Sequence, residues 1–131
     1  MKNPVKNIGI FALLTLAMGL FMTAFAQNAR AQSVINVVGT TWVGTDSDND
    51  YYEYTFMPGG VLHFKSPSGY YTNGTWQQDG DFIYIQTYYQ DTRRKYAERL
   101  GQIKGTHMEG GAGNVVGRTW KWFADLRPNT Q

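Results

Sequence analysis

Short segments of alternating aromatic and polar residues, separated by glycine-containing turns, occupy most of the chain beyond residue 40. In YYEYTFM, the side chains of Tyr52, Tyr54 and Phe56 share one face, and the next segment, VLHFK, follows the turn PGG. Residues two apart lie on the same face of a β-strand. About eight such segments recur at intervals of roughly 8–12 residues, which is typical of a sandwich or a barrel. We therefore predict an all-β fold, a small antiparallel up-and-down β-barrel of about eight strands.

A seven-residue phrase occurs near both ends of the expected barrel. It reads NVVGTTW at Asn36–Trp42 and NVVGRTW at Asn114–Trp120. An up-and-down barrel pairs its first strand with its last, because unpaired strand edges promote aggregation. Two such strands that face one core layer can use the same sequence to close the barrel end: a glycine at a bend and a threonine, followed by a tryptophan whose side chain fills that end. Chance similarity and an old duplication are the alternative interpretations.

The segment DTRRKYAERLG is compatible with two local structures. Asp91 is suited to cap a short helix whose apolar side would include Tyr96 and Leu100, and Gly101 would end it. The alternative is a hairpin in which QDTRRK is the turn and YAERLGQIKG a strand. We favour the hairpin, because the regularly spaced glycines around Ile103 suit a sheet better than a helix.

The first 31 residues have the composition of a secretory signal peptide. Two lysines precede an apolar run that ends at Ala26, and small residues place cleavage after Ala26 or Ala31. We expect a signal-peptide helix and short linker at 1–31, a single barrel domain at 32–125 and a disordered tail at 126–131. The expected location is secreted or periplasmic. A retained anchor is the alternative, and the membrane would be contacted only through this uncleaved leader.

Charge and cysteine content exclude several classes of protein. The chain has 12 Lys and Arg residues against 10 Asp and Glu, but Lys2, Lys6 and Arg30 belong to the leader, which leaves nine against ten. A near-neutral domain lacks the phosphate-binding surface on which nucleic-acid affinity depends, so we expect no nucleic-acid partner. The chain has no cysteine, so disulfides cannot support this small domain and its core has to be built from aromatic residues.

A glycine shortly before a tryptophan on the first strand, with a basic residue near a tryptophan on the last, resembles the calycin group. Lipocalins, avidin-like proteins and fatty-acid-binding proteins belong to this group. In lipocalins a G-x-W motif packs at the closed barrel end beneath an arginine from a late strand. The spacing here is G-x-x-W, and Lys121 is the other candidate for the basic partner. The resemblance implies a structural barrel end built from Gly39, Trp42, Arg118 and Trp120. Several phrases also look like small exported bacterial barrel domains of undefined role.

Residues for catalysis or metal binding do not form a recognisable motif. The aspartates of DSDND alternate as in an EF-hand, but Tyr51 and Met57 occupy the positions where that loop needs glycine and glutamate. A looser surface calcium site that includes Glu53 is an open alternative. His63 and His107 are not in a ligand-spaced cluster, and no nucleophile motif is present. We expect no enzymatic activity, no metal and no cofactor.

Aromatic richness is the one functional signal that stands out. The sequence contains nine tyrosines, more than a small core requires, because a buried hydroxyl needs a hydrogen-bond partner. Alternation predicts that some aromatic side chains face inward and bind a ligand: Tyr52, Tyr54, Tyr70, Trp76 and Trp122. Other tyrosines are expected on the outer face or the rim: Tyr51, Tyr71, Tyr84, Tyr88 and Tyr89. A solid barrel filled by these bulky side chains is the alternative.

These observations favour a non-enzymatic exported binding protein. Its ligand would be a small apolar or planar molecule in or at the mouth of the barrel. The alternative is a protein partner, bound by an envelope accessory protein or inhibitor through its exposed tyrosines and the Gln90–Lys95 loop, since Tyr and Arg are enriched in interface hot spots.

Overall fold

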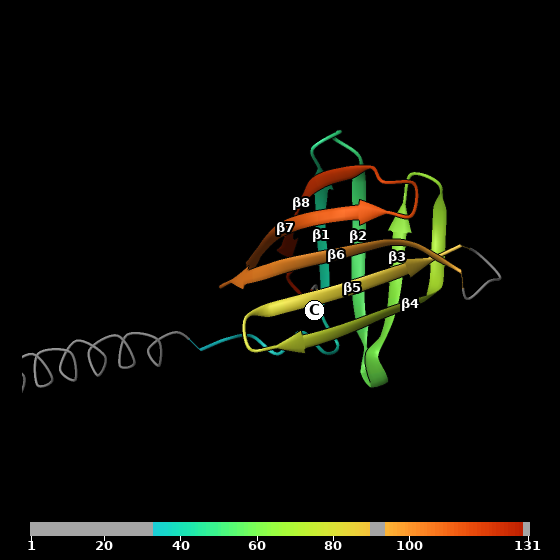
Figure 1. The fold of residues 1–131 in the computed structure, drawn as a ribbon. Helices are drawn as coiled ribbons and strands as arrows, with labels where there is room; N and C mark the ends of the chain where they lie inside the picture. The colour runs from blue at the N-terminus through green and yellow to red at the C-terminus, as the bar shows by residue number, and fades with distance from the viewer. Residues whose placement is uncertain (1–32, 90–93, 130–131) are drawn as a thin grey trace, which may run out of the picture. The chain divides into compact units, whose positions relative to one another are not determined.

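The computed structural model describes residues 33–89 and 94–129, and these residues form a closed antiparallel β-barrel (Figure 1). Each strand pairs with the next along the chain, and the last pairs with the first. The predicted all-β up-and-down barrel is therefore confirmed. The expected signal-peptide helix lies outside the described residues. Among the described residues, no helix is long and apolar enough to cross a membrane. The strands and one short 3₁₀ turn are β1 Thr41–Asp46, β2 Tyr51–Met57, η2 Pro58–Gly60, β3 Val61–Ser66, β4 Gly69–Asp79, β5 Phe82–Tyr88, β6 Lys95–Lys104, β7 His107–Asn114 and β8 Thr119–Leu126.

The two ends of the barrel differ in how they are covered. We call the end with the β1–β2, β3–β4, β5–β6 and β7–β8 connections the loop end, and the opposite end the capped end (Figure 1). Residues 34–40 lie at the capped end, where the side chain of Val37 is fully buried. Gln78 accepts a hydrogen bond from the Val37 amide at 3.1 Å and donates one to the Ile35 carbonyl at 2.7 Å. This segment therefore seals the capped end by both packing and hydrogen bonding.

Apolar side chains fill the interior from the capped end to the middle of the barrel. Trp42 and Trp122 are its largest fully buried side chains, and the Trp42 indole N–H donates to Thr40 Oγ1 at 2.8 Å. A buried side chain of this kind stabilises a fold by roughly 1.5–3 kcal/mol through its removal from water. The core cluster comprises Val37, Trp42, Tyr54, Phe56, Leu62, Phe64, Ile83, Ile85, Ile103, Met108, Trp122 and Ala124.

The repeated phrase encodes the same local structure in both places. Asn36 Oδ1 accepts a hydrogen bond from the amide two residues later at 3.1 Å, and Asn114 Oδ1 does the same at 3.2 Å. Gly39 and Gly117 both have positive φ angles, of 78° and 86°, which a glycine adopts without strain. A strand begins two residues after each glycine. The phrase is therefore an Asx turn that leads into a strand.

The two tryptophans of the phrase do not share a barrel end, which corrects the expectation drawn from the repeat. Trp42 lies opposite Leu126 in the β1–β8 ladder, whereas Asp46 lies opposite Trp122. Because β1 and β8 are antiparallel and both begin with the phrase, their starts lie at opposite ends. Trp42 is at the capped end, and Trp120 is near the loop end.

Two other boundaries are settled by the strand ladders. The segment that includes Tyr96 and Leu100 is strand β6, paired with β5 on one side and β7 on the other, so a strand is confirmed over the helix. Of the expected turn Gln90–Lys95, residues 90–93 lie outside the described part, and Lys95 is the first residue of β6. Leu126, expected in the tail, is the last residue of β8 and donates its amide to the Thr106 carbonyl at 2.8 Å. The barrel therefore extends one residue further than the predicted boundary.

Close approach of β6 and β7 depends on glycine. A β-carbon added to Gly110 would lie 1.9 Å from the Leu100 carbonyl oxygen, and one added to Gly101 would lie 2.6 Å from the Trp122 ring. Gly111, the next residue, has nothing within 4 Å of its added β-carbon. The glycines of this pair of strands thus differ in whether the fold needs them.

We predict that Gly110→Ala destabilises the protein by about 1–3 kcal/mol or prevents folding, because the added methyl would overlap backbone atoms that cannot move aside. Gly111→Ala is the matched control and should change stability by less than about 0.5 kcal/mol. Urea unfolding followed by circular dichroism measures both. Equal stability of the two variants would contradict the strand geometry described here.

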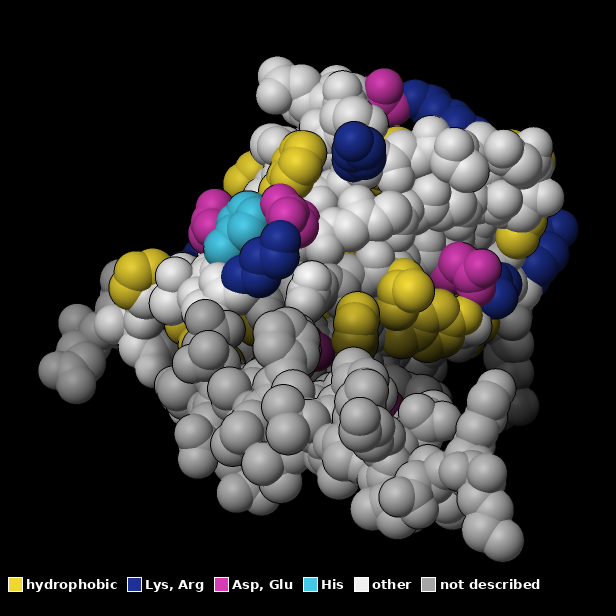
Figure 2. Space-filling model, turned by 60° about the vertical axis from the view of Figure 1, so that its left-hand side comes forward, with side chains coloured by type: hydrophobic (Ala, Val, Ile, Leu, Met, Phe, Trp, Pro, Cys, Tyr) yellow, Lys and Arg dark blue, Asp and Glu magenta, His cyan; other side chains and the backbone are white. Residues whose placement is uncertain are grey.

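A charged cluster joins β6, β7 and β8 on the outer surface. His107 Nδ1 lies 2.9 Å from Asp125 Oδ1, and its Nε2 lies 3.2 Å from Glu109 Oε2. Lys104 pairs with the same glutamate at 2.8 Å, and Figure 2 shows a patch of histidine (cyan), acidic (magenta) and basic (dark blue) side chains on the surface. Hydrogen bonding to Asp125, followed by that to Glu109, raises the pKa of His107 above its ordinary value of 6.5.

This raised pKa predicts a pH-dependent contribution to stability. When a group has a higher pKa in the folded than in the unfolded state, its protonation stabilises the fold. This stabilisation is complete at pH values below the unfolded-state pKa and is lost as the pH rises through the folded-state pKa. The melting temperature of His107→Gln should therefore fall furthest below wild type near pH 6, with the gap closing as the pH is raised above neutrality. His63→Gln is the control, because its ring contacts the Tyr70 hydroxyl rather than a carboxylate. A gap that widens with pH would contradict the prediction.

Candidate functional site

A cavity of about 430 Å³ lies at the loop end of the barrel. The interior is therefore neither solid nor hollow throughout: its capped half is packed and its loop half is open. All eight strands contribute to the barrel, but the cavity walls come from β2 to β6 and three connections, β1–β2, β3–β4 and β5–β6. The lining residues are Asp50, Tyr52, Phe64, Ser66, Pro67, Ser68, Tyr71, Thr87, Tyr88, Tyr89, Tyr96 and Arg99.

Aromatic rings form most of the cavity wall. The rings of Tyr52 and Phe64 stack with centroids 5.5 Å apart and planes at 16°, and Tyr71 continues the row at 6.4 Å from Phe64. On the other side, Tyr89 and Tyr96 make an edge contact at 5.1 Å. Such walls offer flat apolar faces with hydroxyl groups at their edges, which suit a planar ligand.

Arg99 lines the cavity from β6 and is only 2% exposed. Its guanidinium carbon lies 5.0 Å from the Phe64 ring centroid and 5.2 Å from that of Tyr52. The rings of Tyr54 and Trp120 are each 5.7 Å away. A cation over several ring faces is stabilised by their quadrupoles, so this aromatic cage holds the charge in place.

Asp46 organises the β1–β2 connection beside the cavity. Its Oδ1 accepts the amides of Asp48 at 2.9 Å and Asp50 at 3.0 Å, and its Oδ2 accepts the Tyr52 hydroxyl at 3.0 Å. Burial, and then the bond to Asp46, raise the pKa of Tyr52 well above its ordinary value. Asp48 instead pairs with Arg118 on the surface. The aspartate phrase thus serves as a turn, and the described residues contain no cluster of three metal-ligating side chains.

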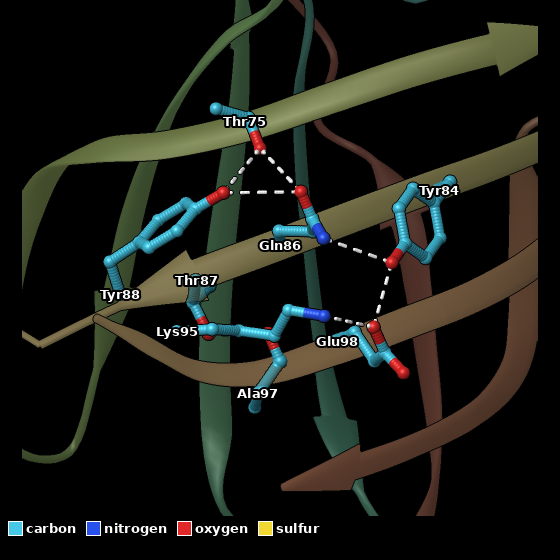
Figure 3. A network of polar contacts seen from close by, with 8 residues as sticks. All are labelled: Thr75, Tyr84, Gln86, Thr87, Tyr88, Lys95, Ala97 and Glu98. Carbon is cyan, nitrogen blue, oxygen red and sulfur yellow. Dashed lines mark hydrogen bonds and ion pairs between the residues drawn. The ribbon is translucent and has the colours of Figure 1, made fainter. Parts of the chain in front are cut away.

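A polar network on the outer face supports the wall formed by β4, β5 and β6 (Figure 3). Glu98 Oε2 accepts hydrogen bonds from Tyr84 and from Lys95, each at 2.7 Å, and Gln86 links Tyr84 to Tyr88. On the inner face of the same strands, Thr87 donates to the Ala97 carbonyl at 3.4 Å. The network therefore links β5 and β6, the two strands whose Thr87 and Arg99 side chains line the cavity.

The structure brings three of the five expected ligand residues together. Tyr52 lines the cavity, as its alternation predicted. Tyr54 and Trp122 face inward but are fully buried beneath the cavity, with ring centroids 5.5 Å apart. They form part of the core and do not line the cavity.

Tyr70 and Trp76 lie away from the cavity, which corrects their predicted positions. Tyr70 is 59% exposed and contacts His63, whereas Tyr71 faces inward. The β3–β4 register shifts between Leu62 and Phe64, and this extra residue in β4 reverses the alternation. Trp76 is inward but near the capped end, where its indole donates to the Met57 and Val61 carbonyls at 2.9 and 3.0 Å.

The expected basic partner of the barrel-end tryptophans is also placed elsewhere. Gly39 and Arg118 are exposed, and Arg118 pairs with Asp48 rather than covering an indole. The guanidinium that does lie over Trp120 belongs to Arg99.

Sequence analysis missed Phe64, Tyr71 and Arg99 as cavity residues. For Arg99 the signal was available: read as a strand, β6 alternates with Ala97, Arg99 and Ile103 on one face, and all three are buried. The helix alternative for this segment obscured that alternation. For Tyr71 the signal was weaker: Gly74, inside the β4 segment, is the kind of residue that marks a bulge, but it does not show on which side the alternation changes.

Comparisons of the chain with protein-family models, with curated proteins and with solved structures found no match.

We predict that Asp46→Ala destabilises the protein by about 1.5–3 kcal/mol, the range for hydrogen bonds to a charged group, because two amides and the Tyr52 hydroxyl lose their acceptor. Asp48→Ala, the matched control, should cost at most about 1 kcal/mol, because its ion pair is exposed to water. Urea unfolding at neutral pH measures both. A larger loss for Asp48→Ala would contradict the structural role given to Asp46.

Proposed function

We propose that this protein is a non-enzymatic, exported, calycin-like binding protein whose barrel cavity holds a small apolar or planar molecule. In this proposal the leader directs the chain to the periplasm or the medium and is then removed after Ala26 or Ala31. The closed eight-strand up-and-down architecture supports the calycin assignment, although the arginine over an indole comes from β6 and not from the β7–β8 turn.

The observation that carries the proposal is the aromatic cavity of about 430 Å³ at the loop end. Ligand pockets for small molecules measure about 300–1,000 Å³ and are lined mainly by apolar and aromatic groups with a few polar ones. The remainder of the interior is packed, so the space is confined to one end, where a ligand can enter. A rigid barrel with a preformed space of this kind suits binding rather than chemistry, because no acid–base pair or nucleophile arrangement accompanies it among the described residues.

We predict that 2-naphthamide, a neutral planar probe, binds the purified protein and raises its melting temperature by mass action. Tyr71→Ala should weaken binding by a factor of about 3–10, since an aromatic contact contributes about 0.5–1.5 kcal/mol. Tyr70→Ala is the matched control, because it removes the same side chain from the opposite face of β4 and should leave affinity unchanged. Fluorescence titration and thermal shift measure both. Equal effects of the two variants, or no binding, would refute the cavity as a ligand site.

The protein-binding alternative is separated by native mass spectrometry of the protein isolated from its host. It would act through the exposed tyrosines and the Gln90–Lys95 loop, of which residues 90–93 lie outside the described part. A retained small molecule supports the proposed function, and a stoichiometric protein partner without a small molecule supports the alternative.

A further inference from the structure

Unpaired hydrogen-bond donors are concentrated at one place inside the barrel. The described residues contain four buried side-chain polar atoms that have no hydrogen-bond partner: Tyr54 Oη, Arg99 Nε, Arg99 Nη1 and Trp120 Nε1. They belong to three residues, and the Arg99 guanidinium carbon lies 5.7 Å from both other rings. Native proteins pair nearly all buried polar groups, so a cluster of four exceptions requires a physical explanation.

All four atoms can donate a hydrogen bond, although the Tyr54 oxygen, which lies beside Arg99, can also accept one. An indole N–H and a guanidinium can only donate, and a tyrosine hydroxyl can donate as well. Burial raises the pKa of Tyr54, which keeps its hydroxyl protonated and able to donate. The cluster therefore has too few acceptors, because the one Tyr54 oxygen cannot serve the N–H groups of Arg99 and Trp120 together.

No carboxylate among the described residues supplies a further acceptor. Arg99 has no acidic oxygen within 4 Å there, although its guanidinium is charged and almost fully buried. Asp46, which is buried on the same side of the barrel, already accepts three hydrogen bonds from two amides and Tyr52. A buried charge without a partner is costly, and retention of such a group is expected where it serves binding.

We propose that Arg99, with Tyr54 and Trp120 beside it, is an anion subsite that binds the carboxylate of an aromatic or apolar acid held in the cavity. The inference rests on the proposed function and specifies its ligand class. The planar guanidinium matches a planar carboxylate, and charge-assisted hydrogen bonds of this kind are strong in a site that excludes water.

The charges on the cavity surface select a monoanion. Among the described lining residues, Arg99 is the one cation and Asp50, at the loop end, is the one acid. A dianion such as a phosphate monoester would keep one negative charge unpaired inside the barrel and meet the carboxylate of Asp50 on entry. The apolar part of the ligand would lie between the Tyr52–Phe64 row and the opposite tyrosines.

The test compares probes that differ only in charge. Wild type should bind 2-naphthoate about tenfold or more tightly than 2-naphthamide, and more tightly than 2-naphthyl phosphate, as measured by isothermal titration calorimetry. Arg99→Met should abolish the preference for the acid while it retains affinity for the amide. Arg99→Lys, which keeps the charge but not the planar fork, should keep part of the preference. Arg118→Met is the matched control and should change nothing.

The melting temperature measured without ligand distinguishes a role of Arg99 in binding from a role in folding alone. Without ligand, Arg99→Met should melt at about the same temperature as wild type, because the lost cation–ring contacts are offset by the removal of a buried charge that has no carboxylate partner. A clear loss of melting temperature would assign Arg99 to the fold and overturn the inference.

Each remaining outcome is also decisive. If naphthoate and naphthamide bind wild type equally, the anion subsite is wrong and the proposed cavity function stands. If the phosphate binds most tightly, the monocarboxylate assignment is wrong. If no probe binds, the proposed function and this inference fall together.

Discussion

Pairing between β1 and β8 is the constraint on which the rest of the molecule depends. It closes the barrel, removes both sheet edges and sets which interior residues lie at each end. Because the two strands are antiparallel, the repeated phrase that starts each of them places Trp42 at the capped end and Trp120 near the loop end. The same Asx turn and strand start therefore occur twice, once before β1 at the capped end and once between β7 and β8 at the loop end.

Closure also divides the interior into two regions of different chemistry. The capped half contains only close-packed apolar and aromatic side chains, while the loop half contains aromatic rings around a space and a buried guanidinium. A chain without disulfides has to obtain its stability from the first region. The second region can then tolerate an unpaired charge, because the cation is held by ring faces and the strands that carry it are joined by the Glu98 network on the outside.

Natural proteins rarely keep a buried cation without a partner unless it serves a purpose beyond folding. Tyr54, Arg99 and Trp120 present donors that the described chain does not satisfy, and they do so beneath a cavity of ligand size. Under the proposed function, these donors and the aromatic wall would be in place before a ligand arrives, which reduces the cost of ordering the site. The same arrangement explains why aromatic residues are so abundant in a domain of this size.

The sequence by itself determined the fold class, the closure of the barrel and the inward placement of Tyr52, because the two-residue period and the glycine turns are local properties. Only the tertiary structure decided where Trp120 and Arg118 lie, since strand direction and register are set by pairing across the barrel. It also decided that Tyr71 and not Tyr70 faces the cavity, because one extra residue in β4 reverses every side chain beyond it. For Arg99, the alternation within β6 already indicated an inward side chain. Its aromatic surroundings could not be predicted, because the rings belong to β2, β3 and β8, which approach β6 only in the folded barrel.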